Sequence, residues 1–285
     1  MPAPSAVLLS PYGRPFHLGA LRLELFPSGY GPGAASLWIK LPSGQCITYA
    51  GTPCAQPELH VEPLQVRAAE TLICAAPLAA HPAALPDRDA ALAALAALVA
   101  EARALAAVTV ILCSPLPTAP TIWRQLSGQG ITALAHPEIE RTLRAYRELG
   151  LLPPHPDGGP RRLGRAVGPG AVILWPAATP LVPVARLQGA ASSLRVILCL
   201  GAALAEAVVM RVRTALPADA VFAGAVALAD SLDQPALLRY IADSEARHVY
   251  LTAGYSDSLA AAAQRMGVRI APLGPPHQLQ LFGAS

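Results

Sequence analysis

Apolar residues in the first third of the chain follow the pattern of β-strands. Residues 21–26 (Leu-Arg-Leu-Glu-Leu-Phe) alternate apolar and polar side chains, which is typical of a strand with one buried face. A glycine-rich loop at residues 27–36 follows, and two more strands are predicted at residues 37–41 and 45–49. Residues 70–75 predict a further strand. We therefore expect a sheet in this region, with the glycine-rich loop between its strands.

The middle of the chain alternates helical patterns with buried strands. Asp87 is the expected N-cap of a helix that continues through an alanine-rich run to residue 107. Residues 108–113 are a continuous apolar run of the kind found in parallel strands. Residues 131–135 predict a strand, and the amphipathic residues 136–150 predict a helix that stops at a glycine. This alternation predicts an α/β layer.

The last third continues the alternation. Residues 151–170 are rich in Pro, Gly and Arg, and we expect an exposed loop there. We expect the strand at residues 220–222 to return the chain to the first sheet. The other predicted elements are strands at residues 171–175, 194–200, 249–252 and 268–271, and helices at residues 121–126, 202–213, 235–244 and 256–266.

Composition narrows the class of protein. The chain has 285 residues, of which 53% are hydrophobic and 14% charged, enough for one or two domains with a large core. A net charge of +3 is too small to indicate strong electrostatic attraction to nucleic acid or to a membrane. No apolar run reaches the about 20 residues that a membrane span needs, and the N-terminus does not resemble a secretory signal. The five cysteines form no CxxC pair, which indicates reduced, buried thiols in a cytoplasmic protein.

Two stretches near the C-terminus carry a family resemblance. Residues 230–238 read Asp-Ser-Leu-Asp-Gln-Pro-Ala-Leu-Leu, and residues 249–255 read Val-Tyr-Leu-Thr-Ala-Gly-Tyr. They resemble the C-terminal signature of β-CASP metallo-β-lactamase-fold nucleases, in particular ligase-associated DNA exonucleases and mRNA 3′-end processing exonuclease-like proteins. There the stretches read approximately Ser-Asp-His-Ala-Asp-Trp-Pro and Val-Thr-His-Gly-Tyr, and both histidines serve the metal site. Ser231 and Ala253 stand at the two histidine positions.

Three upstream motifs resemble the same family in the correct order. Tyr30 stands where the family's glycine loop, Pro-Ala-Gly-His-x-x-Gly-Ser-Ala, has its metal-binding histidine. Thr52 replaces the aspartate that should follow Gly51, and Ala75 replaces the glutamate of Asp-Thr-x-Ile-x-Glu-Ser-Thr-x-Gly. The family's His-x-His-x-Asp-His motif does not occur in the chain. The resemblance therefore implies a site without metal ligands at these positions.

Two carboxylates of the signature persist, Asp230 and Asp233. Without imidazole partners they can hold at most a weak, hydrated cation. The other interpretation, which we favour, is that they cap the helix that begins near Pro235.

The resemblance implies an α/β fold: a truncated metallo-β-lactamase-like αββα sandwich with an inserted β-CASP-like α/β lobe. Residues 1–80 and 220–285 would form the first lobe, and residues 81–219 the inserted lobe. Since the family's first strands and first metal motif would precede residue 10, we expect N-terminal truncation. An open sheet edge should then remain near the N-terminus, where a partner could dock.

The function that this resemblance implies is binding. We expect a pseudonuclease with neither metal nor other cofactor, acting as a binding or scaffold subunit in nucleic-acid processing. Its partner would be an active homologue or a DNA- or RNA-processing enzyme, or a second copy of the chain. The alternative is an active nuclease or other hydrolase, whose site is supplied in trans or built from unrecognised residues. A third hypothesis is a nucleic-acid-binding module that uses the old groove without cleavage, although the small net charge supports it weakly.

Overall fold

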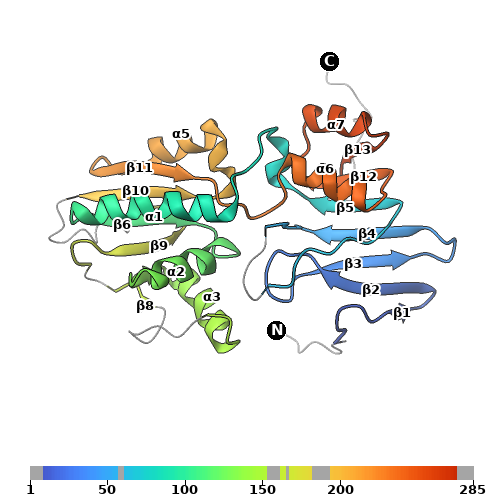
Figure 1. The fold of residues 1–285 in the computed structure, drawn as a ribbon, viewed down its shortest axis with the longest axis horizontal. Coiled ribbons are helices and arrows are strands. Elements are labelled where there is room, and N and C mark those ends of the chain that lie inside the picture. The colour runs from blue at the N-terminus through green and yellow to red at the C-terminus, as the bar shows by residue number, and fades with distance from the viewer. Residues whose placement is uncertain (1–8, 57–60, 153–160, 165–166, 182–192, 275–285) are drawn as a thin grey trace, which may run out of the picture.

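The structure is a computed structural model, and it describes residues 9–56, 61–152, 161–164, 167–181 and 193–274. The described strands form two sheets that lie side by side along the long axis of the molecule (Figure 1). One sheet has seven strands and the other has six. The α/β class predicted from the sequence is confirmed. No helix within the described ranges is both long and apolar enough to span a membrane.

The seven-stranded sheet combines strands from both ends of the chain. Its order is β1-β2-β3-β4-β5-β12-β13. The first four strands are antiparallel neighbours, whereas β4, β5, β12 and β13 pair in parallel. The strands are β1 (Phe16–Leu18), β2 (Leu21–Pro27), β3 (Ala35–Lys40), β4 (Cys46–Gly51), β5 (Thr71–Ala75), β12 (His248–Ala253) and β13 (Arg269–Pro272).

One face of this sheet is covered. The helices α6 (Gln234–Asp243) and α7 (Asp257–Gln264) share a buried apolar cluster with the β5 and β12 side chains of this face, which include Leu72 and Val249. Over β2 and β3 the cover is the segment before β5. There the Trp38 ring nitrogen donates a hydrogen bond of 3.0 Å to the Ala68 carbonyl.

The six-stranded sheet is parallel throughout, and its three central strands β6, β9 and β10 are buried on both faces. Its order is β11-β10-β6-β9-β7-β8. Helices α1 (Arg88–Ala104), α2 (Thr118–Gly128) and α3 (Pro137–Glu148) pack on one face, and α5 (Glu206–Ala215) packs on the other (Figure 1). The strands are β6 (Val108–Cys113), β7 (Ala133–Ala135), β8 (Arg161–Arg162), β9 (Val172–Pro176), β10 (Leu194–Cys199) and β11 (Ala220–Val226).

The expectation that residues 220–222 return the chain to the first sheet is wrong. They begin β11, which pairs in parallel with β10 at the edge of the six-stranded sheet. Helix α1 packs closely against this strand, because a Cβ atom at Gly224 would lie 2.9 Å from the Leu98 side chain. The chain therefore re-enters the first sheet after residue 226, later than the expected boundary at residue 220.

Two further expectations need correction. Residues 151–170 are not all loop, because β8 (Arg161–Arg162) pairs with β7 there. Both arginines are exposed, so no apolar pattern marked this edge strand. The helix expected at residues 202–213 is split into the 3₁₀ turn η2 (Gly201–Leu204) and α5, which begins at Glu206.

Two glycines allow close backbone crossings in the first lobe. Gly254 follows β12 with φ of +90°, and a Cβ atom there would lie 1.8 Å from the Ala76 carbonyl oxygen. Gly29 has φ of +71°, and its Cβ would lie 2.1 Å from the Cys54 carbonyl oxygen. Both crossings place a loop against the end of a neighbouring strand, so only glycine fits.

We predict that Gly254→Ala lowers the free energy of unfolding by about 3 kcal/mol or more, since it combines left-handed strain with a backbone clash. Gly267→Ala is the matched control: Gly267 has φ of +77°, but no atom of the described residues lies within 4 Å of a Cβ there. It should lose only about 1 kcal/mol. Urea unfolding of both variants measures the difference, and equal losses would show that the crossing at Ala76 is not tight.

Candidate functional site

Three of the positions singled out in the sequence lie at the carboxyl ends of neighbouring parallel strands. Thr52 directly follows β4, Ala75 is the last residue of β5, and Ala253 is the last residue of β12. Ala75 and Ala253 are register partners, and the Ala76 amide donates to the Ala253 carbonyl at 3.1 Å. Ligand sites of α/β proteins commonly form outside the carboxyl ends of parallel strands. This edge is therefore the candidate ligand site.

Backbone hydrogen bonds bring the other four positions to the same edge. The Cys54 amide donates to the Ser28 carbonyl at 3.0 Å, which holds the loop of Tyr30 beside the end of β4. The Leu232 amide donates to the Pro53 carbonyl at 3.0 Å, which holds the loop that carries Asp230, Ser231 and Asp233. All seven positions singled out in the sequence are thus gathered at one edge of the sheet.

The six-stranded lobe meets this edge. Ser114 directly follows β6, and its hydroxyl donates a long hydrogen bond of 3.5 Å to the Asp230 carboxylate. The Tyr30 hydroxyl donates to the Leu116 carbonyl at 3.3 Å. The site therefore lies between the two lobes, where the strand ends of both sheets approach each other.

Asp233 has a structural role. Its Oδ1 accepts a hydrogen bond of 2.8 Å from the Ala236 amide and so caps α6. Its Oδ2 accepts one of 2.9 Å from the Leu85 amide, which lies on the path into α1. The capping interpretation is confirmed for Asp233. Asp230 does not cap this helix, because it faces Ser114 instead.

Burial shifts two groups beside this contact toward their neutral forms. Burial raises the pKa of Asp230, although hydrogen bonds from its own backbone amide and from Ser114 lower it in part. Burial also raises the pKa of Tyr30, and the nearby Asp230 and Cys54 add to that effect. The folded protein is therefore less stable when the Asp230 carboxylate is charged than when it is neutral.

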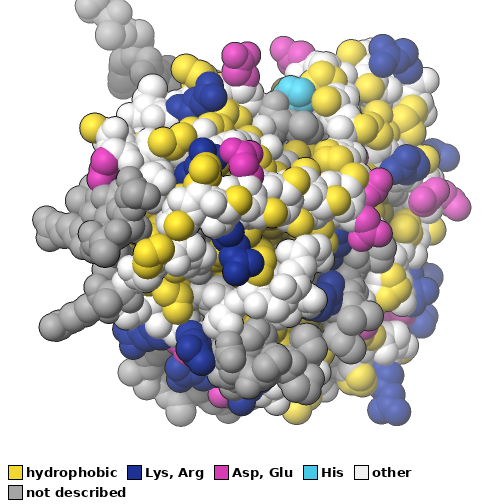
Figure 2. Space-filling view, turned by 60° about the vertical axis from the view of Figure 1, so that its left-hand side comes forward, with side chains coloured by type: hydrophobic (Ala, Val, Ile, Leu, Met, Phe, Trp, Pro, Cys, Tyr) yellow, Lys and Arg dark blue, Asp and Glu magenta, His cyan; other side chains and the backbone are white. Residues whose placement is uncertain are grey.

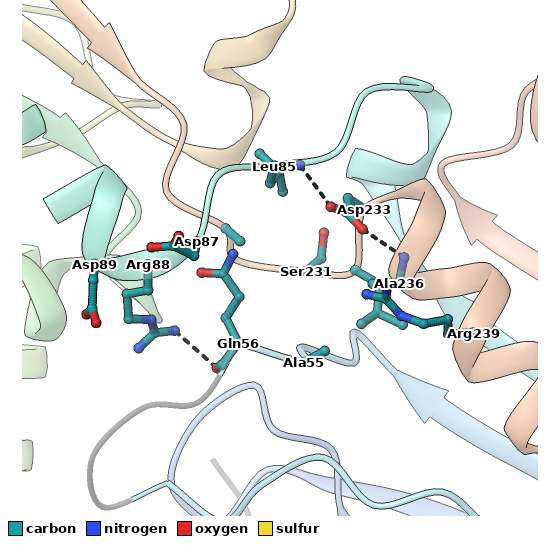
Figure 3. Close-up of a pocket in the computed structure, with 12 residues that line it drawn as sticks. Ala55, Gln56, Leu85, Asp87, Arg88, Asp89, Ser231, Asp233, Ala236 and Arg239 are labelled. Atoms are coloured by element: carbon teal, nitrogen blue, oxygen red, sulfur yellow. Dashed lines mark hydrogen bonds between the residues drawn. The ribbon is translucent and has the colours of Figure 1, made fainter.

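A cavity of about 410 Å³ opens beside these loops (Figure 3). Its walls are the segment after β4, the start of α1 and the start of α6, and both Ser231 and Asp233 line it. Ser231 is 3% exposed, and its hydroxyl makes no hydrogen bond to any described residue. On the opposite wall, the Gln56 side-chain amide donates to the Pro86 carbonyl at 2.9 Å, while Arg88 donates to the Gln56 backbone carbonyl at 3.3 Å.

Sequence reasoning missed most of this cavity. Gln56, Arg88 and Arg239 line it, but they come from three separate segments and follow no motif spacing. Asp87 was identified only as the N-cap of α1, which is confirmed: its carboxylate accepts a hydrogen bond of 2.7 Å from the Ala90 amide. Only the loop at residues 230–233 carried a signal in the sequence.

The donor set at this edge does not fit a metal centre like that of the nucleases. Of the seven positions, only Asp230 and Asp233 carry a carboxylate, and both Asp233 oxygens accept backbone amides. Throughout the described ranges, no three His, Cys, Asp or Glu side chains are grouped so that they could hold a metal ion. All five cysteines are among the described residues, and none of them forms a disulfide there. The polar side chains at this edge can instead form hydrogen bonds, and the two aspartates carry charge.

Comparison with models of known protein families gives no match, and neither does comparison with curated proteins. Fold and site together define an α/β protein with a polar cavity between two sheets.

We predict that Asp230→Asn raises the free energy of unfolding at pH 7. A carboxyl whose pKa is raised in the folded state binds its proton more tightly there, so its contribution is present at low pH and is lost as pH rises through the folded pKa. The gain over wild type should therefore shrink as pH falls toward 3.8, the ordinary value. Urea unfolding from pH 3 to 8 measures this.

The control for Asp230→Asn is Asp243→Asn, which removes the same charge from an exposed position at the end of α6. A gain at pH 7 that both variants share would come from net charge. Loss of stability in Asp230→Asn alone would show that the Ser114 contact needs the charged carboxylate.

Proposed function

We propose that the protein is a metal-free relative of the β-CASP metallo-β-lactamase-fold nucleases and acts as a binding or scaffold subunit in nucleic-acid processing. In this proposal the seven-stranded sheet is the remnant of the αββα sandwich, and the six-stranded lobe is the β-CASP-like insertion. The order of the motifs supports it, as does the meeting of their loops at one sheet edge. The lack of disulfides among the described cysteines fits the cytoplasmic location that we propose.

The observation that carries the binding proposal is an apolar face of the seven-stranded sheet that the described residues leave partly exposed. Tyr49 is 49% exposed and Tyr250 is 37% exposed, whereas Val249 and Leu251 on the covered face are each 1% exposed. We call this surface the open face. Its members follow the cross-strand register and are all at least partly exposed: Leu25, Leu37, Ile39, Ile47, Tyr49, Ile73 and Tyr250.

An exposed apolar surface of this kind usually marks an interface. The edge beside the N-terminal strands, where we expected a partner, is a poorer candidate. There β2 is already paired with β1, and the Gly13 amide donates to the Leu25 carbonyl at 2.9 Å. The edge strand β1 has only three residues, and short edge strands discourage pairing with another chain. We therefore propose docking on the face rather than on the edge.

The partner that fits the open face is a protein with an apolar sheet face of its own, such as an active homologue. Two sheets can pack face to face about 10 Å apart with their side chains interdigitated. Nucleic acid fits less well, because its binding depends on Lys and Arg contacts to phosphates and the open face consists of aliphatic and aromatic side chains. On the side of the six-stranded lobe, Arg and acidic side chains are interspersed (Figure 2).

We predict that the double variant Tyr49→Arg/Tyr250→Arg loses partner binding at least about ten-fold, since two charges would be buried at the interface. The measurement is light scattering at micromolar concentration, alone and with any intact nuclease, ligase or helicase encoded beside its gene. Tyr255→Arg is the control, because Tyr255 is 38% exposed but lies in the loop after β12. A wild-type protein that stays monomeric with every candidate overturns the proposal, whereas a homodimer identifies a second copy as the partner.

The alternative, an active nuclease or hydrolase, differs in metal content. We predict that the purified protein holds no stoichiometric zinc, manganese or iron, because among the seven positions only Asp230 carries a carboxylate not already used by two backbone amides. Elemental analysis before and after zinc addition and gel filtration measures this. Retained metal at one equivalent, bound by three or more protein ligands in a soaked crystal, would favour the enzyme.

A further inference from the structure

We propose that a second cavity, between the glycine-rich loop and α3, binds a small carboxylic acid with an apolar body, such as an arylacetic acid or a medium-chain fatty acid. Its volume is about 370 Å³, within the range of about 300–1,000 Å³ that is usual for ligand pockets. The inference does not depend on partner docking at the open face. We call this the apolar cavity, and the described residues on its walls include Tyr30, Pro32, Leu116, Arg141, Ala145 and Leu149.

The two walls of the apolar cavity come from different lobes and meet at defined points. The glycine-rich loop of the first lobe forms one wall, and α3 forms the other together with Leu116, which follows β6. The Tyr30 hydroxyl donates to the Leu116 carbonyl at 3.3 Å, and a Cβ atom at Gly31 would lie 3.6 Å from the Tyr146 hydroxyl oxygen. The Ala34 amide donates to the Gly31 carbonyl at 3.0 Å, which fixes the shape of the loop. The cavity is therefore formed before any ligand enters it.

Apolar side chains on these walls are open to solvent. Helix α3 buries Ile139 and Leu143 in the core of the six-stranded lobe, whereas its residues Ala145 and Leu149 line the apolar cavity. Leu149 is 69% exposed and Leu116 is 42% exposed. A ligand can reach both, and an apolar body that covers them gains free energy from the apolar surface removed from water.

The apolar cavity has one charged group on its walls. Among the described residues that line it, only Arg141 is charged. Arg141 is exposed, and its guanidinium makes no hydrogen bond or ion pair within the described part of the chain. An arginine at such a rim can lay its stem on apolar surface while the guanidinium stays in water. There it can bind a carboxylate through two parallel hydrogen bonds, so the acid would place its head at the rim and its body inside.

The acidic groups near α3 do not cancel this charge. Glu140 is already paired with Arg144. The other two carboxylates of the helix, Glu138 and Glu148, do not line the apolar cavity, and neither does Asp230. The cavity therefore favours an anion over a cation. A small hydrated anion such as phosphate fits poorly, because it has no apolar surface with which to cover the walls.

The test is calorimetry and thermal shift on the full chain with phenylacetate and octanoate. Phenylacetamide and octanamide lack the charge, and phenethylamine and octylamine reverse it. At least one of the two acids should bind with one-to-one stoichiometry, and its amide and amine should bind at least about ten-fold more weakly, as expected for losing a charge-assisted hydrogen bond. Failure of both acids to bind, or equal binding of an acid and its amide, overturns the proposal.

Variants locate the bound acid. Arg141→Gln should weaken binding at least about ten-fold, whereas Arg211→Gln, at an exposed site on α5, should not. Ala145→Phe should block binding without loss of folding, because it places a ring in the apolar cavity from an exposed position. Unchanged affinity in both Arg141→Gln and Ala145→Phe overturns the proposal.

The open face is the other exposed apolar surface that could take up these acids. The double variant Tyr49→Arg/Tyr250→Arg should therefore keep acid binding at the apolar cavity while it loses the protein partner. Acid binding that this variant loses and Ala145→Phe keeps would place the acid on the open face and overturn the proposal. Arg141→Gln should in turn keep partner binding, so this proposal and the proposed function can fail separately.

Discussion

One carboxylate holds together the two crossings between the lobes. The chain leaves the seven-stranded sheet after β5 on its way to α1, and it returns after β11 on its way to α6. Asp233 accepts the Leu85 amide from the first crossing and the Ala236 amide from the second. Leu85 and Asp233 are 148 residues apart in the sequence, so this contact closes a very long loop. The placement of the cavity walls depends on it, because each crossing supplies one wall.

The polar groups at this junction divide into satisfied and unsatisfied ones. Asp233 has a backbone donor for each oxygen, and Asp87 has one at Ala90. Within the described part of the chain, the Ser231 hydroxyl, two residues before Asp233, makes no hydrogen bond. Most buried polar groups in folded proteins are paired, so Asp233 holds this loop in place through its hydrogen bonds, whereas the neighbouring Ser231 hydroxyl does not.

Local patterns in the sequence predicted the elements whose signal is local. The alternation in β2, the apolar run of β6 and the cap at Asp87 all depend on residues within one turn or one strand. Strand β11 was misassigned because its place beside β10 depends on packing under α1, where Gly224 admits Leu98. The cavity could not be predicted for the same reason. Gln56, Arg88 and Arg239 become neighbours only after both crossings are formed.

Strand β3 explains why the open face was not evident in the sequence. Leu37 and Ile39 lie on the open face, while Trp38 lies on the covered face with its ring nitrogen bonded to Ala68. Apolar side chains on both faces are typical of a strand buried on both sides. In the structure Leu37 and Ile39 keep partial exposure. The mismatch between an apolar sequence and a partly exposed face could be recognised only once the covered face was known.

The sheet connects the open face to the cavity through α6. In β5 and β12, alternate residues point to opposite faces: Ile73 and Tyr250 to the open face, Leu72 and Val249 to the core under α6. Leu237 and Ile241 of α6 are fully buried in that core, and this packing fixes the helix that carries Arg239. A partner on the open face would therefore contact the same strands, β5 and β12, that position one wall of the cavity. Because alternate residues of a strand point to opposite faces, the open face and the core under α6 stay separate. Both are built on the same closely packed strands, which makes them parts of one rigid unit.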